Sequence, residues 1–161
     1  MFNVGDKIVY PMYGAGVIEE IEEKEIDGNK CLYYAVNMPV SNLKITVSVA
    51  KAETVGVRYI DEPHSVMTTI RETRPIEMSS NWNERYKENT ARIKTGSLKK
   101  VTEVFKTLIL KERERSLSSV EKKMLSNTKQ IIVSELILSQ GIEKSEAEKL
   151  LYDITLTKAS A

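Results

Sequence analysis

Hydrophobic positions in the first sixty residues recur at every second residue, which is the period of a β-strand with one buried face. This alternation predicts five short strands at residues 7–10, 16–23, 30–38, 44–49 and 55–60. Between the second and third strands, Asp27-Gly28 is a typical hairpin turn because both residues tolerate positive φ. Five short strands with tight turns indicate a small SH3- or Tudor-like β-barrel over residues 1–60.

From about Asp61 the spacing of hydrophobic residues changes to three and four, the period of an amphipathic helix. Serines suited to N-caps and glycines suited to helix ends divide residues 61–161 into four or five helices. The expected N-caps are Ser65, Ser79 or Ser80, Ser97, Ser118 in a capping box with Glu121, and Ser145; Gly96 and Gly141 are expected helix ends. The sequence therefore predicts an α+β protein, with the barrel followed by a compact all-helical domain.

The composition removes most enzyme chemistries. One cysteine, Cys31, and one histidine, His64, cannot supply the roughly four soft ligands of a zinc site or the nucleophile–base pairs of hydrolases. No Walker-type or Gly-x-Gly-x-x-Gly loop occurs. We therefore expect a protein that is not an enzyme and that uses no cofactor, metal or small-molecule substrate.

The sequence also lacks membrane and export signals. No apolar run reaches the roughly 20 residues that span a bilayer, and the N-terminus has no cationic region followed by an apolar stretch. A single cysteine excludes an internal disulfide and fits a reducing cytosol. We expect a cytoplasmic protein with no membrane partner.

Charge is distributed unevenly along the chain. Residues 1–60 hold 6 Lys or Arg against 8 Asp or Glu, whereas residues 61–161 hold 18 against 15. The segment 82–115 alone holds 10 against 5, a net charge of +5. This moderate positive charge favours a protein that contacts DNA with the help of a second partner over one that binds DNA alone.

Trp82, the single tryptophan, begins the helix expected after Ser80 and has two interpretations. Trp82, Tyr86 and Ile93 lie at i, i+4 and i+11, so they can form one stripe that faces the core. Alternatively, a large ring in the first turn of a helix can open a base step of DNA while nearby cations hold the phosphates.

Several cations are candidates for that second role. Arg85 and Lys87 follow Trp82 closely, and Lys122 and Lys123 follow the expected start of the long helix. All four also fit an ordinary solvated helix face. In the barrel, the acidic hairpin arm at residues 19–25 repels DNA, which favours docking on a protein, for example through a strand edge.

Four motifs follow one another in order along nearly the whole chain. The first runs from Val4 to Gly14 and continues as Gly16-Val17-Ile18 and Ile21-Glu22, and the second is Val55-Gly56-Val57-Arg58. The third is Asn81-Trp82-x-x-Arg85-Tyr86-Lys87-x-Asn89, and the fourth begins at Glu112-Arg113 and ends at Glu121-Lys122-Lys123-Met124-Leu125. Together these motifs resemble those of the CarD family of bacterial transcription regulators.

The resemblance implies a Tudor-like first domain, shared with the transcription-repair coupling factor, that docks on the β subunit of RNA polymerase. It implies a helical second domain that meets promoter DNA at the upstream edge of the transcription bubble. There Trp82 would wedge into the minor groove beside Arg85 and Lys87, with weak sequence preference, and stabilise the open complex of the holoenzyme. The protein would then associate with the nucleoid through the polymerase.

The resemblance also places the polymerase-facing residues. Lys24 stands where a basic polymerase contact is expected, and Ile26 follows it on the same hairpin arm. Thr46 and Ser48 stand where many members have Arg and Pro, and Tyr13 replaces a common His. The main alternative is a protein-interaction adaptor that does not bind DNA, with a peptide-binding barrel. A more distant one is an enzyme that uses carboxylates alone.

Overall fold

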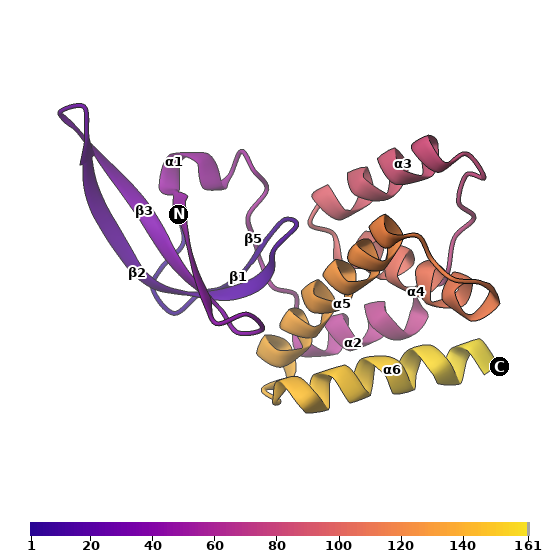
Figure 1. Ribbon diagram of the computed structural model, residues 1–161. Helices are drawn as coiled ribbons and strands as arrows, with labels where there is room; N and C mark the ends of the chain where they lie inside the picture. The colour runs from indigo at the N-terminus through magenta and orange to yellow at the C-terminus, as the bar shows by residue number, and fades with distance from the viewer. Residues whose placement is uncertain (161) are drawn as a thin grey trace.

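The N-terminal part of the protein is a five-stranded antiparallel sheet (Figure 1). The computed structural model describes the backbone of residues 1–160 and the side chains of residues 1–156. The strands are β1 (Lys7–Tyr10), β2 (Gly14–Ile26), β3 (Asn29–Met38), β4 (Leu43–Ser48) and β5 (Arg58–Tyr59), in the order β4-β3-β2-β1-β5. Helices follow the sheet, which confirms the predicted α+β class.

The expected fifth strand is much shorter than predicted. Only Arg58–Tyr59 pairs with β1, and a short helix, α1 (Val49–Ala52), follows β4. The reason is that the backbone amides of Val55, Gly56 and Val57 donate to carbonyls of residues 51–53 instead of to a neighbouring strand. The sheet keeps β4 and β5 as its two edges, and Ala52 of α1 packs into the core beneath it.

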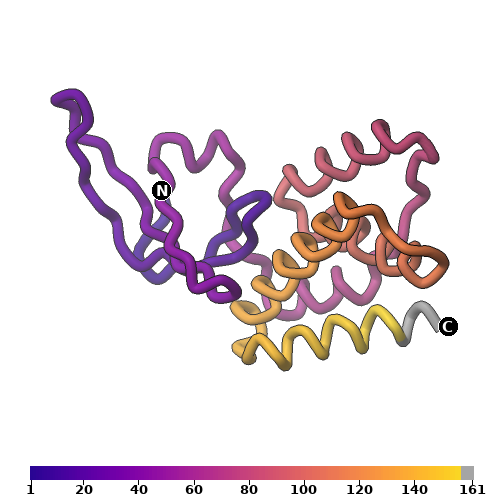
Figure 2. The backbone as a smooth tube through the Cα atoms, viewed as in Figure 1, coloured from indigo at the N-terminus to yellow at the C-terminus, as the bar shows by residue number. Residues whose placement is uncertain are grey.

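The two faces of the sheet have different neighbours. One face holds the small core of this half, and Tyr34 is 1% exposed there, whereas the adjacent Tyr33 lies on the opposite face, as alternation predicts. At the β2–β3 turn Asp27 and Gly28 both have positive φ, which confirms the predicted hairpin. The hairpin extends beyond the rest of the sheet (Figure 2). The core residues of this half are Ile8, Ile18, Tyr34, Val36, Met38, Val47, Ala52 and Val57.

The C-terminal part consists of five helices around a second core. They are α2 (Pro63–Glu72), α3 (Trp82–Lys94), α4 (Leu98–Glu114), α5 (Ser119–Gln140) and α6 (Lys144–Ser160). Phe105 and Leu108 of α4 and Ile132 and Leu136 of α5 are fully buried at its centre. Ser97 and Ser118 cap α4 and α5 through their side chains, and Gly141 ends α5 in the left-handed conformation, all as predicted.

Three expected caps are wrong. Helix α6 begins at Lys144, one residue before Ser145, because its helical hydrogen bonds already start where the Ala147 amide donates to the Glu143 carbonyl. Helix α2 begins two residues before Ser65, at Pro63, because proline has no N–H to satisfy and its fixed φ suits the first helical position. Helix α3 is capped by Asn81 and not by Ser79 or Ser80, since the Asn81 side chain accepts a hydrogen bond from the Glu84 amide at 3.1 Å. Trp82 is therefore the first residue of α3.

Helix α5 connects the two halves. It begins beneath α3 and ends beside the sheet (Figure 1). At the sheet, the Ala15 amide donates to Ser134 Oγ at 2.8 Å, and a Cβ added to Gly14 would lie 2.6 Å from the same oxygen. This close approach, which glycine permits, fixes the start of β2 against α5.

Candidate functional site

Trp82 is exposed, so its interpretation as a core residue is wrong. Its side chain is 44% exposed and that of Tyr86 is 43% exposed, whereas Ile93 on the same stripe is buried. The stripe therefore faces solvent at the N-terminal end of α3 and the core at the other end. A large aromatic side chain at an exposed helix start is available to a partner.

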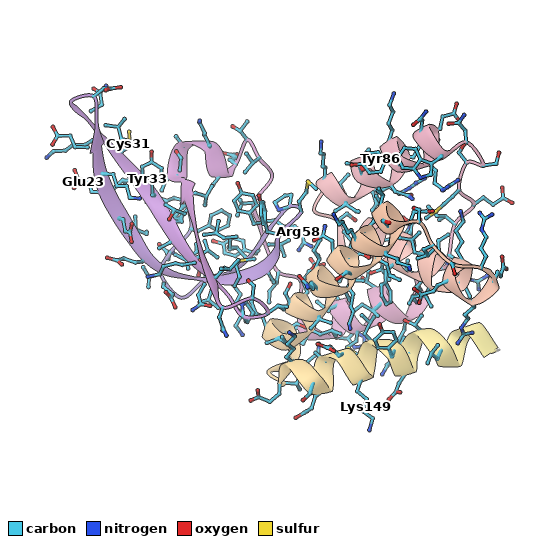
Figure 3. The ribbon with its side chains drawn as sticks, viewed as in Figure 1. Glu23, Cys31, Tyr33, Arg58, Tyr86 and Lys149 are labelled. Atoms are coloured by element: carbon cyan, nitrogen blue, oxygen red, sulfur yellow. The ribbon has the colours of Figure 1, made fainter. Side chains whose placement is uncertain are left out.

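Trp82 and Tyr86 form a stacked pair. Their ring planes differ by only 6° and their centroids are 5.7 Å apart, an offset-stacked arrangement. The i, i+4 spacing places both side chains on one face of α3 (Figure 3 labels Tyr86). Stacking restricts the rotamers of the Trp82 ring before any partner arrives. No binding role was expected for Tyr86, although its i, i+4 spacing from Trp82 indicated a pair.

Arg85 lies inside the protein, unlike the surface cation that the sequence analysis expected. It is 7% exposed, and its Nε donates to Glu121 Oε2 at 3.1 Å. Its Nη1 donates to the carbonyls of Ser79 and Ser80 at 3.1 and 3.3 Å. The guanidinium therefore joins the segment before α3 to the first turn of α5, and it positions Trp82 instead of reaching outward to a phosphate.

Lys87, Lys122 and Lys123 are all exposed. Lys123 of α5 and Tyr86 of α3 line one hollow of about 370 Å³, so the structure brings Lys123 near the Tyr86 member of the aromatic pair. Lys87 directly follows Tyr86, and Lys122 directly precedes Lys123. The positive N-terminal end of α3, where Trp82 stands, adds to the potential that favours an anion there.

The four expected polymerase-facing residues share one face of the sheet. Tyr33 of β3 lies opposite Glu22 of β2 on one side and opposite Ser48 of β4 on the other, so these three side chains point to the same face of the sheet. Lys24 and Ile26 lie two and four residues after Glu22 on β2, and alternation along the strand places them on that face as well. Thr46 lies two residues from Ser48 on β4 and has the same orientation. Lys24, Ile26 and Thr46 are exposed and Ser48 is half-buried. The structure thus gathers Lys24, Ile26, Thr46 and Ser48 on one open surface.

Tyr33 also belongs to this surface, a role that was not expected from the sequence. The Lys24 ammonium lies 5.2 Å from the centroid of its ring and 3.9 Å from the Glu22 carboxylate. Cys31 is opposite Lys24 on β3 (Figure 3). We call the exposed surface formed by Lys24, Ile26, Cys31, Tyr33, Thr46 and Ser48 the outer sheet face. Tyr33 can be assigned to this surface from its pairing with Glu22 and Ser48, and this register is known only once the strands are paired.

A buried ion pair lies where the sheet meets the helices. Arg58 Nη2 of β5 donates to Glu135 Oε1 of α5 at 3.2 Å, and Arg58 Nε donates to the Gly96 carbonyl (Figure 3). Glu135 is fully buried, and its second oxygen has no hydrogen-bond partner among the described residues. Burial raises the pKa of Glu135 to about 7, although Arg58 opposes the shift. The pair orients the sheet relative to α5.

Metal and membrane chemistry find no support in the described part of the chain. Within it, no group of three or more His, Cys, Asp or Glu side chains is arranged to hold a metal ion. Likewise, none of its helices has the length and apolar character that crossing a bilayer requires.

These features define a protein with a small sheet and a helical bundle, each with an exposed surface, and with α5 packed against both. Comparison with known families gives the same division. The CarD-like/TRCF RID domain matches residues 2–60, and the CarD C-terminal domain matches residues 65–152. The chain is 36% identical over 148 residues to YdeB of Bacillus subtilis (strain 168), named as a candidate transcription factor; the match covers 91% of this chain and 97% of YdeB. The chain belongs to the CarD family of transcription regulators.

Proposed function

We propose that this protein stabilises the open complex that RNA polymerase forms at promoters. In this proposal residues 1–60 form a domain that docks on the β subunit through the outer sheet face, with Lys24, Ile26, Thr46 and Ser48 in contact. Residues 61–161 form a second domain that places Trp82 in the minor groove at the upstream edge of the bubble. The observation that carries the proposal is the exposed Trp82, stacked on Tyr86, with Lys87 exposed on the same helix and Lys123 lining a hollow with Tyr86.

The wedge acts by differential affinity. Inserting an aromatic ring between base pairs costs a few kcal/mol of unstacking, and this cost is smaller where the duplex is already distorted. Trp82 therefore binds the open state better than the closed state, and every 1.4 kcal/mol of difference shifts the equilibrium about tenfold. Groove shape and unstacking cost decide affinity, so sequence preference is weak.

Rigidity makes the wedge effective. The Trp82 ring is held by Tyr86, and the start of α3 is held by the hydrogen bonds of Arg85 to Glu121 and to the carbonyls before α3. A side chain that is already ordered loses less conformational entropy on insertion. Arg85 thus contributes as a positioning residue, while Lys87, Lys122 and Lys123 are the cations left to contact phosphates.

Docking on the polymerase would give the protein a high local concentration at the promoter, which the modest positive charge of the helices does not provide. The +5 charge of segment 82–115 gives weak binding at cellular salt, and tethering raises the local concentration of Trp82 at the promoter. Helix α5 spans 22 residues, about 33 Å, from beside α3 to the sheet. A rigid link of this kind fixes where Trp82 lies once the sheet is docked.

Charge reversal on the outer sheet face tests the docking half of the proposal. Lys24→Glu is expected to weaken capture of the protein by the β subunit in a pull-down, because it removes the ammonium and places a carboxylate beside Glu22. Lys30→Glu is the matched control, since Lys30 lies on the same hairpin but pairs with Glu25 on the other side of the sheet. Equal capture of Lys24→Glu and wild type would contradict docking through this face.

Open-complex lifetime tests the DNA half. Wild-type protein is expected to slow the decay of holoenzyme–promoter complexes after a competitor challenge, and Trp82→Ala is expected to leave the decay as it is without protein. Because Trp82 is exposed, Trp82→Ala should fold normally. If the protein binds polymerase without changing the lifetime, a protein-interaction adaptor becomes the better interpretation.

A further inference from the structure

Beyond Trp82, the groove between α3 and α5 contains a hollow whose size and lining suit a planar ligand. Its volume of about 370 Å³ is near the lower end of the range of about 300–1,000 Å³ found for small-molecule sites. Ile93 and Met124 line it with apolar surface, and the Tyr86 ring forms one side. Thr90, Val120, Lys123, Asn127 and Met12 complete the lining.

Tyr86 stands between this hollow and Trp82. Trp82 is four residues before Tyr86 on α3 and Thr90, which lines the hollow, is four residues after it. The Trp82 and Tyr86 rings are nearly parallel, and Tyr86 also lines the hollow together with Thr90. Tyr86 therefore offers aromatic surface to a flat ligand in the hollow.

The polar groups of the hollow match a nucleotide. Lys123 is exposed at its edge and supplies a cation for a phosphate. Asn127 carries an amide that can donate to and accept from the edge of a base, and Thr90 adds a hydroxyl. Within residues 1–156 neither of these two side chains makes a hydrogen bond with another residue, so both are available.

We propose that this hollow binds a single unpaired base of promoter DNA, stacked on Tyr86, with its phosphate at Lys123. The inference rests on the proposed DNA contact of α3, but it assigns a second site with a different ligand. Trp82 acts on a base step that is still paired, whereas the hollow takes a base that has already left the duplex. Aromatic stacking is available to every base, so no base is strongly preferred.

The test uses the full-length protein at low ionic strength, where phosphate contacts are strongest, and needs no polymerase. The probe is a short duplex with one unpaired 2-aminopurine, compared with a duplex in which the same 2-aminopurine is paired. Wild type is expected to bind the unpaired probe roughly 5- to 150-fold more tightly, the range that stacking of one base gives, and to quench its fluorescence.

Two variants and two controls assign the effect to the hollow. Tyr86→Leu removes the ring, so it is expected to abolish the preference and the quenching. Asn127→Leu replaces the amide with an apolar side chain of nearly the same shape, so it is expected to weaken the preference for the unpaired probe. Tyr86→Phe keeps the ring, and Ser126→Leu places the same apolar side chain on the neighbouring exposed position of α5, so both should behave as wild type. Circular dichroism verifies that each variant is folded.

Equal affinity for the two probes, no binding of the unpaired probe, quenching that survives Tyr86→Leu, or a preference that Asn127→Leu leaves unchanged would overturn the inference. None of these results bears on docking or on promoter opening by Trp82. Conversely, if Trp82→Ala supports opening as well as wild type does, the proposed function fails while the unpaired-base site can still be measured. The two failures are therefore distinguishable.

Discussion

The buried carboxyl of Glu135 makes the junction between sheet and helices sensitive to pH. Its side chain is fully buried, one oxygen accepts from Arg58, and burial raises its pKa from the usual 4.5 to about 7. Asp61, the other charged group beside the pair, reinforces the rise. Glu135→Gln keeps an acceptor for Arg58 and cannot ionise, so it isolates the effect of the charge.

The direction and size of the effect follow from linkage. Between pH 4.5 and about 7 the folded protein holds a proton on Glu135 that the unfolded chain has lost, so stability falls as pH rises through this window. At about 1.4 kcal/mol per pKa unit, the loss approaches about 3 kcal/mol at pH 8. It is absent below pH 4.5, where both states carry the proton.

Urea unfolding of the two proteins from pH 4 to pH 8, followed by circular dichroism, measures this contribution. Other carboxylates titrate in both proteins, so the informative quantity is the difference between Glu135→Gln and wild type. Glu135→Gln should gain stability relative to wild type by about 3 kcal/mol between pH 4 and pH 8. A difference that stays constant with pH would refute the assignment of a raised pKa to Glu135.

Two further predictions concern the residues that position the site. Arg85→Ala should lower stability by about 3–5 kcal/mol in thermal denaturation, because it leaves the Glu121 carboxylate without its buried partner, whereas Lys87→Ala should change it by less than about 0.5 kcal/mol. Gly14→Ala should cost more than Gly28→Ala by urea unfolding. Both glycines have positive φ, but only at Gly14 does the new Cβ collide with α5, so equal costs would contradict the close approach.

The elements that were predicted correctly from the sequence are those whose stabilising interactions join residues close to one another along the chain. The first strand matches β1 at both ends, the Asp27-Gly28 turn forms as expected, and Ser97 and Ser118 cap their helices. In each case the deciding interaction lies within a few residues. The fifth strand failed because its amides bond back to α1, a choice that depends on how the chain packs after β4.

The sequence was sufficient to identify most residues of the candidate site, but it did not show what each side chain contacts. The sequence identified Trp82 and its surrounding cations, yet it left open whether the Trp82, Tyr86 and Ile93 stripe faced solvent or core. It also offered Arg85 as a surface cation, because its partner Glu121 is 36 residues away and becomes a neighbour only when α5 packs beside α3. Tyr86 stacks on Trp82 through local i, i+4 spacing, whereas the hollow that it shares with Lys123 forms only when α5 packs beside α3.

Promoter opening in real time tests the central claim most directly. The assay uses the cognate holoenzyme, a promoter fragment with a fluorophore at the upstream edge of the bubble, and saturating wild-type or Trp82→Ala protein. Binding of both proteins to polymerase is verified first. We expect wild type to raise the open fraction and Trp82→Ala, although folded and bound, to leave it at the level of polymerase alone. An equal rise with both proteins would contradict the wedge.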